Sequence, residues 1–138
     1  MSEVRLSWSG EGLSFDGRTS YGAPITLGAH DEGQAAKASD LLPLSLAACT
    51  AYEVVVILQK QRQELRTLDA IVTSTQDPDP PWRFRTIDIE WVVGGTVDLR
   101  KAERAVELSE QKYCAVAATI AQAVELTHRV RIEPSPAH

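Results

Sequence analysis

The sequence contains little cysteine, little histidine and no excess of basic residues. Its 138 residues include two cysteines, three histidines, and 14 lysines and arginines against 19 aspartates and glutamates. The net charge of −5 disfavours nucleic acid or an anionic membrane as partner, since both are bound by clustered lysines and arginines. The cysteines and histidines form no closely spaced pair and no Cys/His hydrolase signature, so we expect no metal and no such hydrolase.

The N-terminal segment also lacks the pattern of a secretory signal. No basic region followed by an apolar core is present in MSEVRLSWSG. We therefore expect a cytoplasmic protein, in which lasting structural disulfides are rare. Two cysteines in such a protein indicate redox chemistry, metal binding or plain core packing.

The length and composition fit one globular domain. Hydrophobic residues make up 43% of the chain and charged residues 24%, and we find no repeat, low-complexity tract or linker. A single domain is expected over residues 1–138, with residues 134–138 as a frayed tail.

The longest apolar run predicts a helix from Leu41 to Leu58, with Ser39 or Asp40 as its N-cap. A membrane span normally needs about 20 predominantly apolar residues, and Ser45 and Glu53 interrupt this run, so we expect no membrane. A helix that is apolar on nearly every side must be wrapped by protein. Because one small domain is too small to cover every side of such a helix, the sequence indicates a homodimer in which a partner subunit covers one side.

The remaining elements follow from turn residues and periodicity. A turn is expected at Asp16-Gly17, and Asp98 is expected to cap a second helix that reaches Cys114. The order of strands, helix, strands, helix and strand predicts an α+β architecture without βαβ units. The expected strands span residues 4–10, 12–17, 23–28, 68–75, 84–93 and 126–133.

Two cysteine-bearing stretches resemble those of a known family. Cys49 lies within ASDLLPLSLAACTAYEVV, and Cys114 lies within EQKYCAVAATIAQAV. Together they are similar to the OsmC/Ohr family, the osmotically inducible and organic hydroperoxide resistance proteins, over about residues 4–133. The resemblance implies an intertwined homodimer, with antiparallel sheets around a long central cysteine-bearing helix and two active sites at the subunit interface. It also implies a thiol peroxidase that reduces organic hydroperoxides without metal, haem or flavin.

The resemblance also assigns roles to the cysteines. Cys49 is expected to attack the hydroperoxide and become a sulfenic acid, with which Cys114 condenses to a disulfide. An external dithiol, in the family often a lipoylated protein, then reopens the bridge. The two Cα atoms must approach to about 4.4–6.8 Å for this.

Ionisation of Cys49 needs a nearby cation. A free thiol has a pKa of about 8.5 and is only a few per cent thiolate at pH 7. The family uses an arginine held by an acidic residue near the start of the cysteine helix, and by resemblance these are Arg18 and Asp40. Asp40 stands where many members have glutamate. The other interpretation of Arg18 is a solvated arginine beside a glycine turn.

Several neighbours of the cysteines leave alternatives open. Glu53, one helical turn after Cys49, can form a structural ion pair, act as a general acid or base, or face solvent. Ala115 replaces the family's usual proline and should let the helix run on past Cys114. The segment from Val116 to Val124 either continues this helix or starts a short third one. Four aromatic residues either pack in the core or interface or line a hydroperoxide pocket: Tyr52, Trp82, Trp91 and Tyr113.

A second function remains open beside the peroxidase. The same fold could serve as a dimeric stress protein or binding protein for an apolar or acidic small molecule. The cysteines would then be packing residues, since unpaired cysteine is among the most buried residue types.

Overall fold

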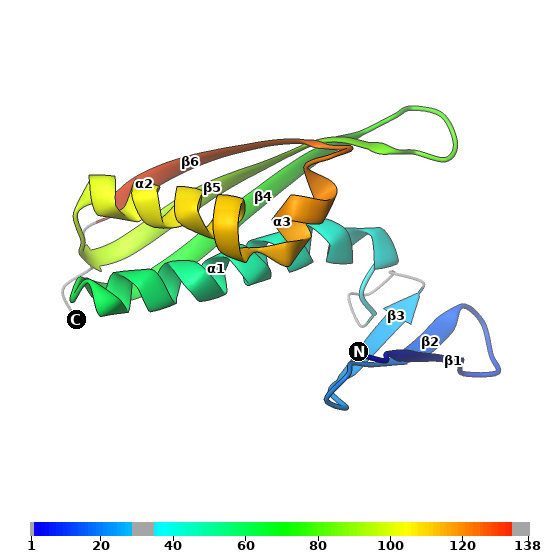
Figure 1. Cartoon of the computed structure of the whole chain (residues 1–138). Helices are drawn as coiled ribbons and strands as arrows, with labels where there is room; N and C mark the ends of the chain where they lie inside the picture. The colour runs from blue at the N-terminus through cyan, green and yellow to red at the C-terminus, as the bar shows by residue number, and fades with distance from the viewer. Residues whose placement is uncertain (1, 29–34, 134–138) are drawn as a thin grey trace. The chain divides into compact units, whose positions relative to one another are not determined.

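The computed structural model describes residues 2–28 and 35–133 (Figure 1). The expected C-terminal tail lies outside the described residues. Contacts divide the chain into two compact units, Met1–Leu42 and Pro43–His138. The expectation of a single domain stays a prediction.

The first unit contains a three-stranded antiparallel sheet. Its strands are β1 (Arg5–Trp8), β2 (Ser14–Arg18) and β3 (Pro24–Gly28), in the order β1-β2-β3, and the 3-10 helix η2 (Ala38–Asp40) ends the unit. The three strands expected from the sequence are confirmed.

The turn expected at Asp16-Gly17 is wrong, because both residues lie inside β2. The chain turns instead after Thr19, whose carbonyl accepts a hydrogen bond from the Gly22 N–H over 2.9 Å. Gly17 serves close packing between strands. A Cβ atom there would lie 3.1 Å from the carbonyl oxygen of Ile25, so the absence of a side chain lets β3 approach.

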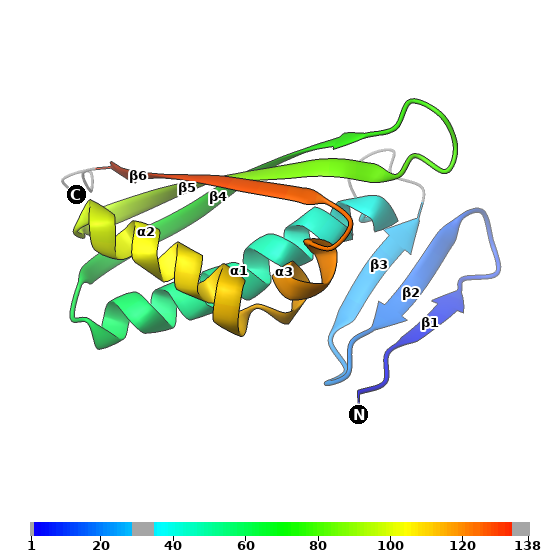
Figure 2. The same cartoon turned by 45° about the horizontal axis from the view of Figure 1, so that its top comes forward.

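The second unit packs helices on one face of a second three-stranded sheet (Figures 1 and 2). The sheet has the order β4-β5-β6, and α1 enters this unit at Pro43. The chain order is α1 (Leu41–Lys60), β4 (Glu64–Gln76), β5 (Phe84–Thr96), α2 (Leu99–Leu108), η3 (Ser109–Tyr113), α3 (Ala115–Ile120) and β6 (Glu125–Glu133).

The expected α+β architecture is confirmed, with one difference in the second sheet. β4 and β5 are antiparallel neighbours, as expected of antiparallel sheets. β6, however, runs parallel to β5, although antiparallel sheets were expected. The reason is the connection: α2, η3 and α3 carry the chain back along the sheet before β6 begins, and parallel neighbours require such a crossover.

The core of this unit lies between the sheet and the helices. Alternate residues of β5 from Ile87 to Val93 are buried, and Val92 and Gly94 are buried as well. Asp98 caps α2 as expected, since its carboxylate accepts a hydrogen bond from the Lys101 N–H over 3.2 Å. The core side chains include Leu46, Val54 and Leu58 of α1, Ile87, Ile89, Trp91 and Val93 of β5, and Ala102, Ala105 and Val106 of α2.

The long helix keeps a large apolar surface. Residues 38–60 include an 18-residue stretch with a mean hydropathy of 2.0, and 28% of that stretch is buried. By length and composition alone this helix could cross a membrane, but the core helix of a soluble protein has the same properties. Leu44 and Tyr52 are 59% and 69% exposed, so α1 has apolar side chains that this chain leaves uncovered.

Candidate functional site

The structure brings the two predicted cysteines together from different elements. Cys49 lies in the middle of α1, and Cys114 lies at the junction of η3 and α3. Both are free thiols; Cys49 is partly exposed, whereas Cys114 is 3% exposed. The two thiols are close enough to interact, and this interaction contributes to a raised pKa of Cys49.

Of the two expectations for the segment after Cys114, a continuing helix is wrong and a short third helix is confirmed. α2 passes into a π-type turn, η3, and Cys114 itself is extended, with φ −92° and ψ 105°. α3 then begins at Ala115, and the Cys114 sulfur accepts a hydrogen bond from the Ala117 N–H over 3.3 Å. Cys114 is thus the N-cap residue of the next helix, a position that serine or aspartate usually occupies. The helix begins here although Ala115 stands in place of the family's proline.

Buried hydrogen bonds hold this turn against α1. The Ser109 hydroxyl donates to the carbonyl oxygen of Thr50 over 3.0 Å, and the Thr50 hydroxyl donates to the Cys114 sulfur over 3.5 Å. Thr50 and Ser109 are both fully buried. A buried hydroxyl group destabilises the fold unless it is hydrogen-bonded. These two bonds therefore favour the turn at this position, although the surrounding sequence favours a continuous helix.

The surroundings of the Cys49 sulfur act on its pKa in opposite directions. Burial raises the pKa of the Cys49 thiol most, and the neighbouring thiol of Cys114 raises it further. Backbone N–H groups of Val116 and Ala115 lower the pKa but do not compensate. A nearby positive charge is therefore still needed to make Cys49 a thiolate at neutral pH.

Arg18 lies in the first unit and pairs with Asp16 over 3.2 Å within β2. Asp40, at the end of η2, is exposed and forms no ion pair within residues 2–28 and 35–133. Because Cys49 belongs to the other unit, the predicted action of Arg18 on Cys49 stays a prediction.

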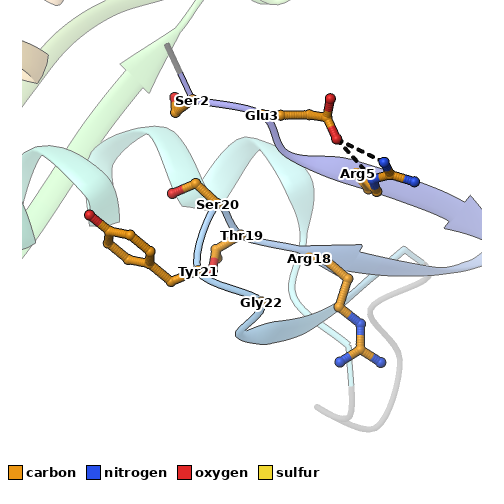
Figure 3. A pocket seen from close by; sticks show the side chains of 8 residues that line it. All are labelled: Ser2, Glu3, Arg5, Arg18, Thr19, Ser20, Tyr21 and Gly22. Atoms are coloured by element: carbon orange, nitrogen blue, oxygen red, sulfur yellow. Dashed lines mark hydrogen bonds and ion pairs between the residues drawn. The ribbon is translucent and has the colours of Figure 1, made fainter.

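Arg18 lines two hollows of the small sheet. One, of about 620 Å³, is bordered by Glu3, Arg5 and Tyr21 (Figure 3). In it Arg5 pairs with Glu3 over 2.9 Å, whereas the Arg18 guanidinium lies apart from that pair. The second hollow, of about 260 Å³, is apolar and is lined by Val4, Leu6, Ile25 and Leu27 together with Arg5, Gly17, Arg18 and Thr19.

Among the described residues, no hydrogen bond or ion pair joins the other predicted site residues to either thiol. Glu53 is half-buried, and its carboxylate has no hydrogen bond or ion pair with any residue in the described part of the chain. Trp91 is fully buried in the core, which favours packing, and its Nε1 atom has no hydrogen-bond partner among the described residues. Tyr52, Trp82 and Tyr113 are exposed.

Sequence reasoning missed Thr50 and Ser109. The available signal was their chemistry: each is a hydroxyl residue at an apolar position of a helix pattern, and Thr50 directly follows Cys49. Within the described ranges, no three histidines, cysteines, aspartates or glutamates are grouped to hold a metal ion.

Known proteins resemble this chain in sequence and in fold. Protein YhfA of Escherichia coli K12 is 33% identical over 132 residues, which cover 94% of this chain and 97% of the relative. The crystal structure of a hypothetical protein from Aquifex aeolicus VF5 has a TM-score of 0.83 and 30% identity, covering 96% of this chain and 98% of that one. The organic hydroperoxide resistance protein OhrB of Bacillus subtilis has the same fold, with a TM-score of 0.63 at 17% identity over 95% of this chain and 98% of that one. The model of the OsmC-like protein family matches residues 30–129, and the chain therefore belongs to the OsmC-like proteins.

Proposed function

We propose that this protein is a thiol peroxidase that reduces organic hydroperoxides, with Cys49 as the attacking and Cys114 as the resolving cysteine. The observation that carries the proposal is that α1 and the turn before α3 bring the two thiols together. Thr50, the residue after Cys49, donates a hydrogen bond to the Cys114 sulfur over 3.5 Å, and the Cys114 thiol acts on the pKa of Cys49. Partial exposure of Cys49 and burial of Cys114 fit the two roles, since the attacking sulfur must meet substrate and the resolving one need only meet Cys49.

The chemistry proceeds in three steps. The Cys49 thiolate attacks the terminal oxygen of the hydroperoxide, the O–O bond breaks, and the alkoxide takes a proton and leaves as the alcohol. The Cys114 thiolate then attacks the sulfenic sulfur of Cys49, whose hydroxyl leaves with a proton as water, and a disulfide forms. An external dithiol, of which a lipoylated protein is one example, takes the oxidising equivalents and restores both thiols.

The working unit that we propose is a homodimer in the cytoplasm. Pairing places Leu6, Gly17 and Ile25 in one row across the small sheet, and Trp8, Phe15 and Leu27 in the next, so one face of this sheet is apolar. Leu6 and Trp8 are 61% and 60% exposed. This face and the uncovered apolar surface of α1 give a second copy two surfaces to cover. In the assembled site Arg18, held by Asp40, supplies the positive charge for Cys49, and Glu53 pairs with a cation of the partner.

The test is turnover of an alkyl hydroperoxide with a dithiol. The parent protein is expected to consume hydroperoxide, Cys49→Ser to lose all turnover, and Cys114→Ser to stop at a sulfenic acid on Cys49 that a dimedone-type probe captures. Unchanged turnover in Cys49→Ser would disprove the role of Cys49. Gel filtration or sedimentation of the same samples checks the dimer.

A second candidate is a protein that binds an apolar small molecule with no peroxidase activity. The apolar hollow of about 260 Å³ beside Arg18 and the raised pKa of Cys49 favour it. It predicts no turnover in the parent with several dithiols, together with ligand-induced changes in tryptophan fluorescence that Leu6→Glu abolishes.

A further inference from the structure

The two cysteines differ in their access to solvent and in the donors that face their sulfur atoms. Cys49 is partly exposed, whereas Cys114 is 3% exposed. The Cys114 sulfur accepts hydrogen bonds from the Thr50 hydroxyl at 3.5 Å and from the Ala117 N–H at 3.3 Å. The Cys114 backbone is fixed as well, since its N–H donates to the Ser109 carbonyl over 2.7 Å.

These differences decide how a Cys49–Cys114 disulfide would be reopened. In thiol–disulfide exchange one sulfur receives the attacking thiolate and the other leaves with the electron pair of the S–S bond. The better leaving sulfur is the one whose negative charge is stabilised, and hydrogen bonds to a charged acceptor are the strong ones. Backbone N–H groups of Ala115 and Val116 face the Cys49 sulfur, whereas Cys114 has a side-chain hydroxyl donor, Thr50, beside the Ala117 N–H. The accessible sulfur is Cys49.

We infer that the reducing dithiol attacks the Cys49 sulfur, and that Thr50 is a positioning residue that directs this choice by stabilising the leaving Cys114 sulfur. This inference rests on the proposed disulfide cycle. The dithiol's thiolate forms a mixed disulfide with Cys49, the Cys49–Cys114 bond breaks, and its electron pair goes to Cys114. The second thiol of the dithiol then attacks the first dithiol sulfur, which is bonded to Cys49 in the mixed disulfide. The Cys49 thiolate is released, and the dithiol leaves as a cyclic disulfide.

Thr50 is well placed for this role in the fold. Its side chain is fully buried, and its carbonyl oxygen accepts the hydroxyl of Ser109, so the same residue is bonded to the turn at two points. Because α1 holds both Cys49 and Thr50, any movement of Cys49 toward Cys114 carries the donor with it. The inference therefore requires the donor to stay beside Cys114 in the oxidised protein, as it is in the reduced one.

The experiment uses a disulfide made with diamide, which does not depend on peroxidase activity. The oxidised full chain reacts briefly with 2-mercaptoethanol, is quenched with acid, and free thiols are capped with N-ethylmaleimide. Peptide mass spectrometry then shows which cysteine carries mercaptoethanol. We expect mercaptoethanol on Cys49 and the maleimide on Cys114.

Three variants separate positioning from packing. Thr50→Val keeps the shape and removes the donor, so reduction should slow about tenfold and the adduct should spread to both cysteines. Thr50→Ser keeps the hydroxyl and should restore the parent behaviour. Ser109→Ala breaks the neighbouring buried hydrogen bond without touching a sulfur, and should keep the adduct on Cys49.

Several outcomes overturn the inference. They are an adduct mainly on Cys114 in the parent, a Thr50→Val protein that behaves like the parent, an equal effect of Ser109→Ala, or failure of diamide to form the bridge. If diamide forms the bridge but an alkyl hydroperoxide does not, the proposed peroxidase falls while the direction of exchange is still measured.

Discussion

The hydroxyl of Thr50 donates a hydrogen bond to the sulfur of Cys114 over 3.5 Å. The residue that follows one cysteine in the sequence therefore holds the other. Adjacent residues of a helix point about 100° apart, and here Thr50 is fully buried while Cys49 is partly exposed. One turn of α1 thus presents Cys49 outward and fixes Cys114 inside.

Removing the Arg18 guanidinium should slow the attack of Cys49. Burial and the Cys114 thiol raise the pKa of Cys49, so a thiolate at neutral pH depends on a cation that Arg18 supplies in our proposal. In Arg18→Gln we expect hydroperoxide turnover to fall about tenfold and the pH midpoint of Cys49 alkylation, measured in a Cys114→Ser background, to rise by about one unit.

Arg5→Gln is the matched control for Arg18. Arg5 lines the same hollow of the small sheet and, like Arg18, pairs with a nearby carboxylate, here Glu3 over 2.9 Å. Our proposal gives Arg5 no action on Cys49, so its loss should leave the alkylation midpoint and turnover unchanged. Equal behaviour of the two variants would show that Arg18 is a solvated surface arginine.

The turn before Cys114 should be sensitive to Ser109. Ser109→Ala leaves the Thr50 carbonyl without the hydroxyl that donates to it over 3.0 Å, at a fully buried position. We expect the free energy of unfolding in urea to fall by about 1–2 kcal/mol. Thr119→Ala removes an exposed hydroxyl that donates to the Ala115 carbonyl, and should change stability by less than about 0.5 kcal/mol. Similar losses in both variants would contradict a special role of the buried bond.

The cap of α2 gives a third prediction. Asp98 accepts a hydrogen bond from the Lys101 N–H, and its own N–H donates to the Gln63 side chain over 3.0 Å. Asp98→Ala removes only the first of these and should cost about 1 kcal/mol in urea unfolding. Asp98→Asn keeps a capping oxygen and should recover most of the loss; an unchanged stability of Asp98→Ala would show that the cap is dispensable.

The sequence predicted the features that depend on local pattern. The cap at Asp98, the apolar helix around Cys49 and the alternating strand from Phe84 follow from propensity and periodicity, and the structure confirms them. The prediction of a turn at Asp16-Gly17 was wrong, because a glycine required for close strand packing cannot be told from a turn glycine by sequence alone.

The junction at Cys114 could not be predicted from neighbouring residues. Ala115 favours helix, yet the helix is interrupted because Ser109 and Cys114 bond to Thr50, which is far away in the sequence. The parallel course of β6 likewise depends on how the crossover lies on the sheet. Long-range contacts therefore determine the part of the candidate site that local preferences miss.

A pH dependence is expected from the pair that joins β6 to the turn before Cys114. The Nδ1 atom of His128 lies 3.2 Å from the Glu110 carboxylate. This bond raises the pKa of His128 despite the opposing effect of burial, and the charges of Glu107 and Glu103 on α2 add to the rise. A raised pKa in the folded state means that folding takes up protons, so the stabilisation is complete below the unfolded value of about 6.5 and is lost as pH rises through the folded pKa.

Glu110→Gln should reveal this dependence directly. Urea unfolding between about pH 5 and pH 9 is expected to show a parent-minus-variant difference in stability that is largest at the acid end and shrinks as pH rises. An NMR titration should place the His128 pKa lower in the variant than in the parent. Glu107→Gln is the control, because Glu107 acts on His128 only through its charge and should shift the titration less. A stability difference that stays constant across the pH range would show that Glu110 acts through packing and not through the protonated histidine.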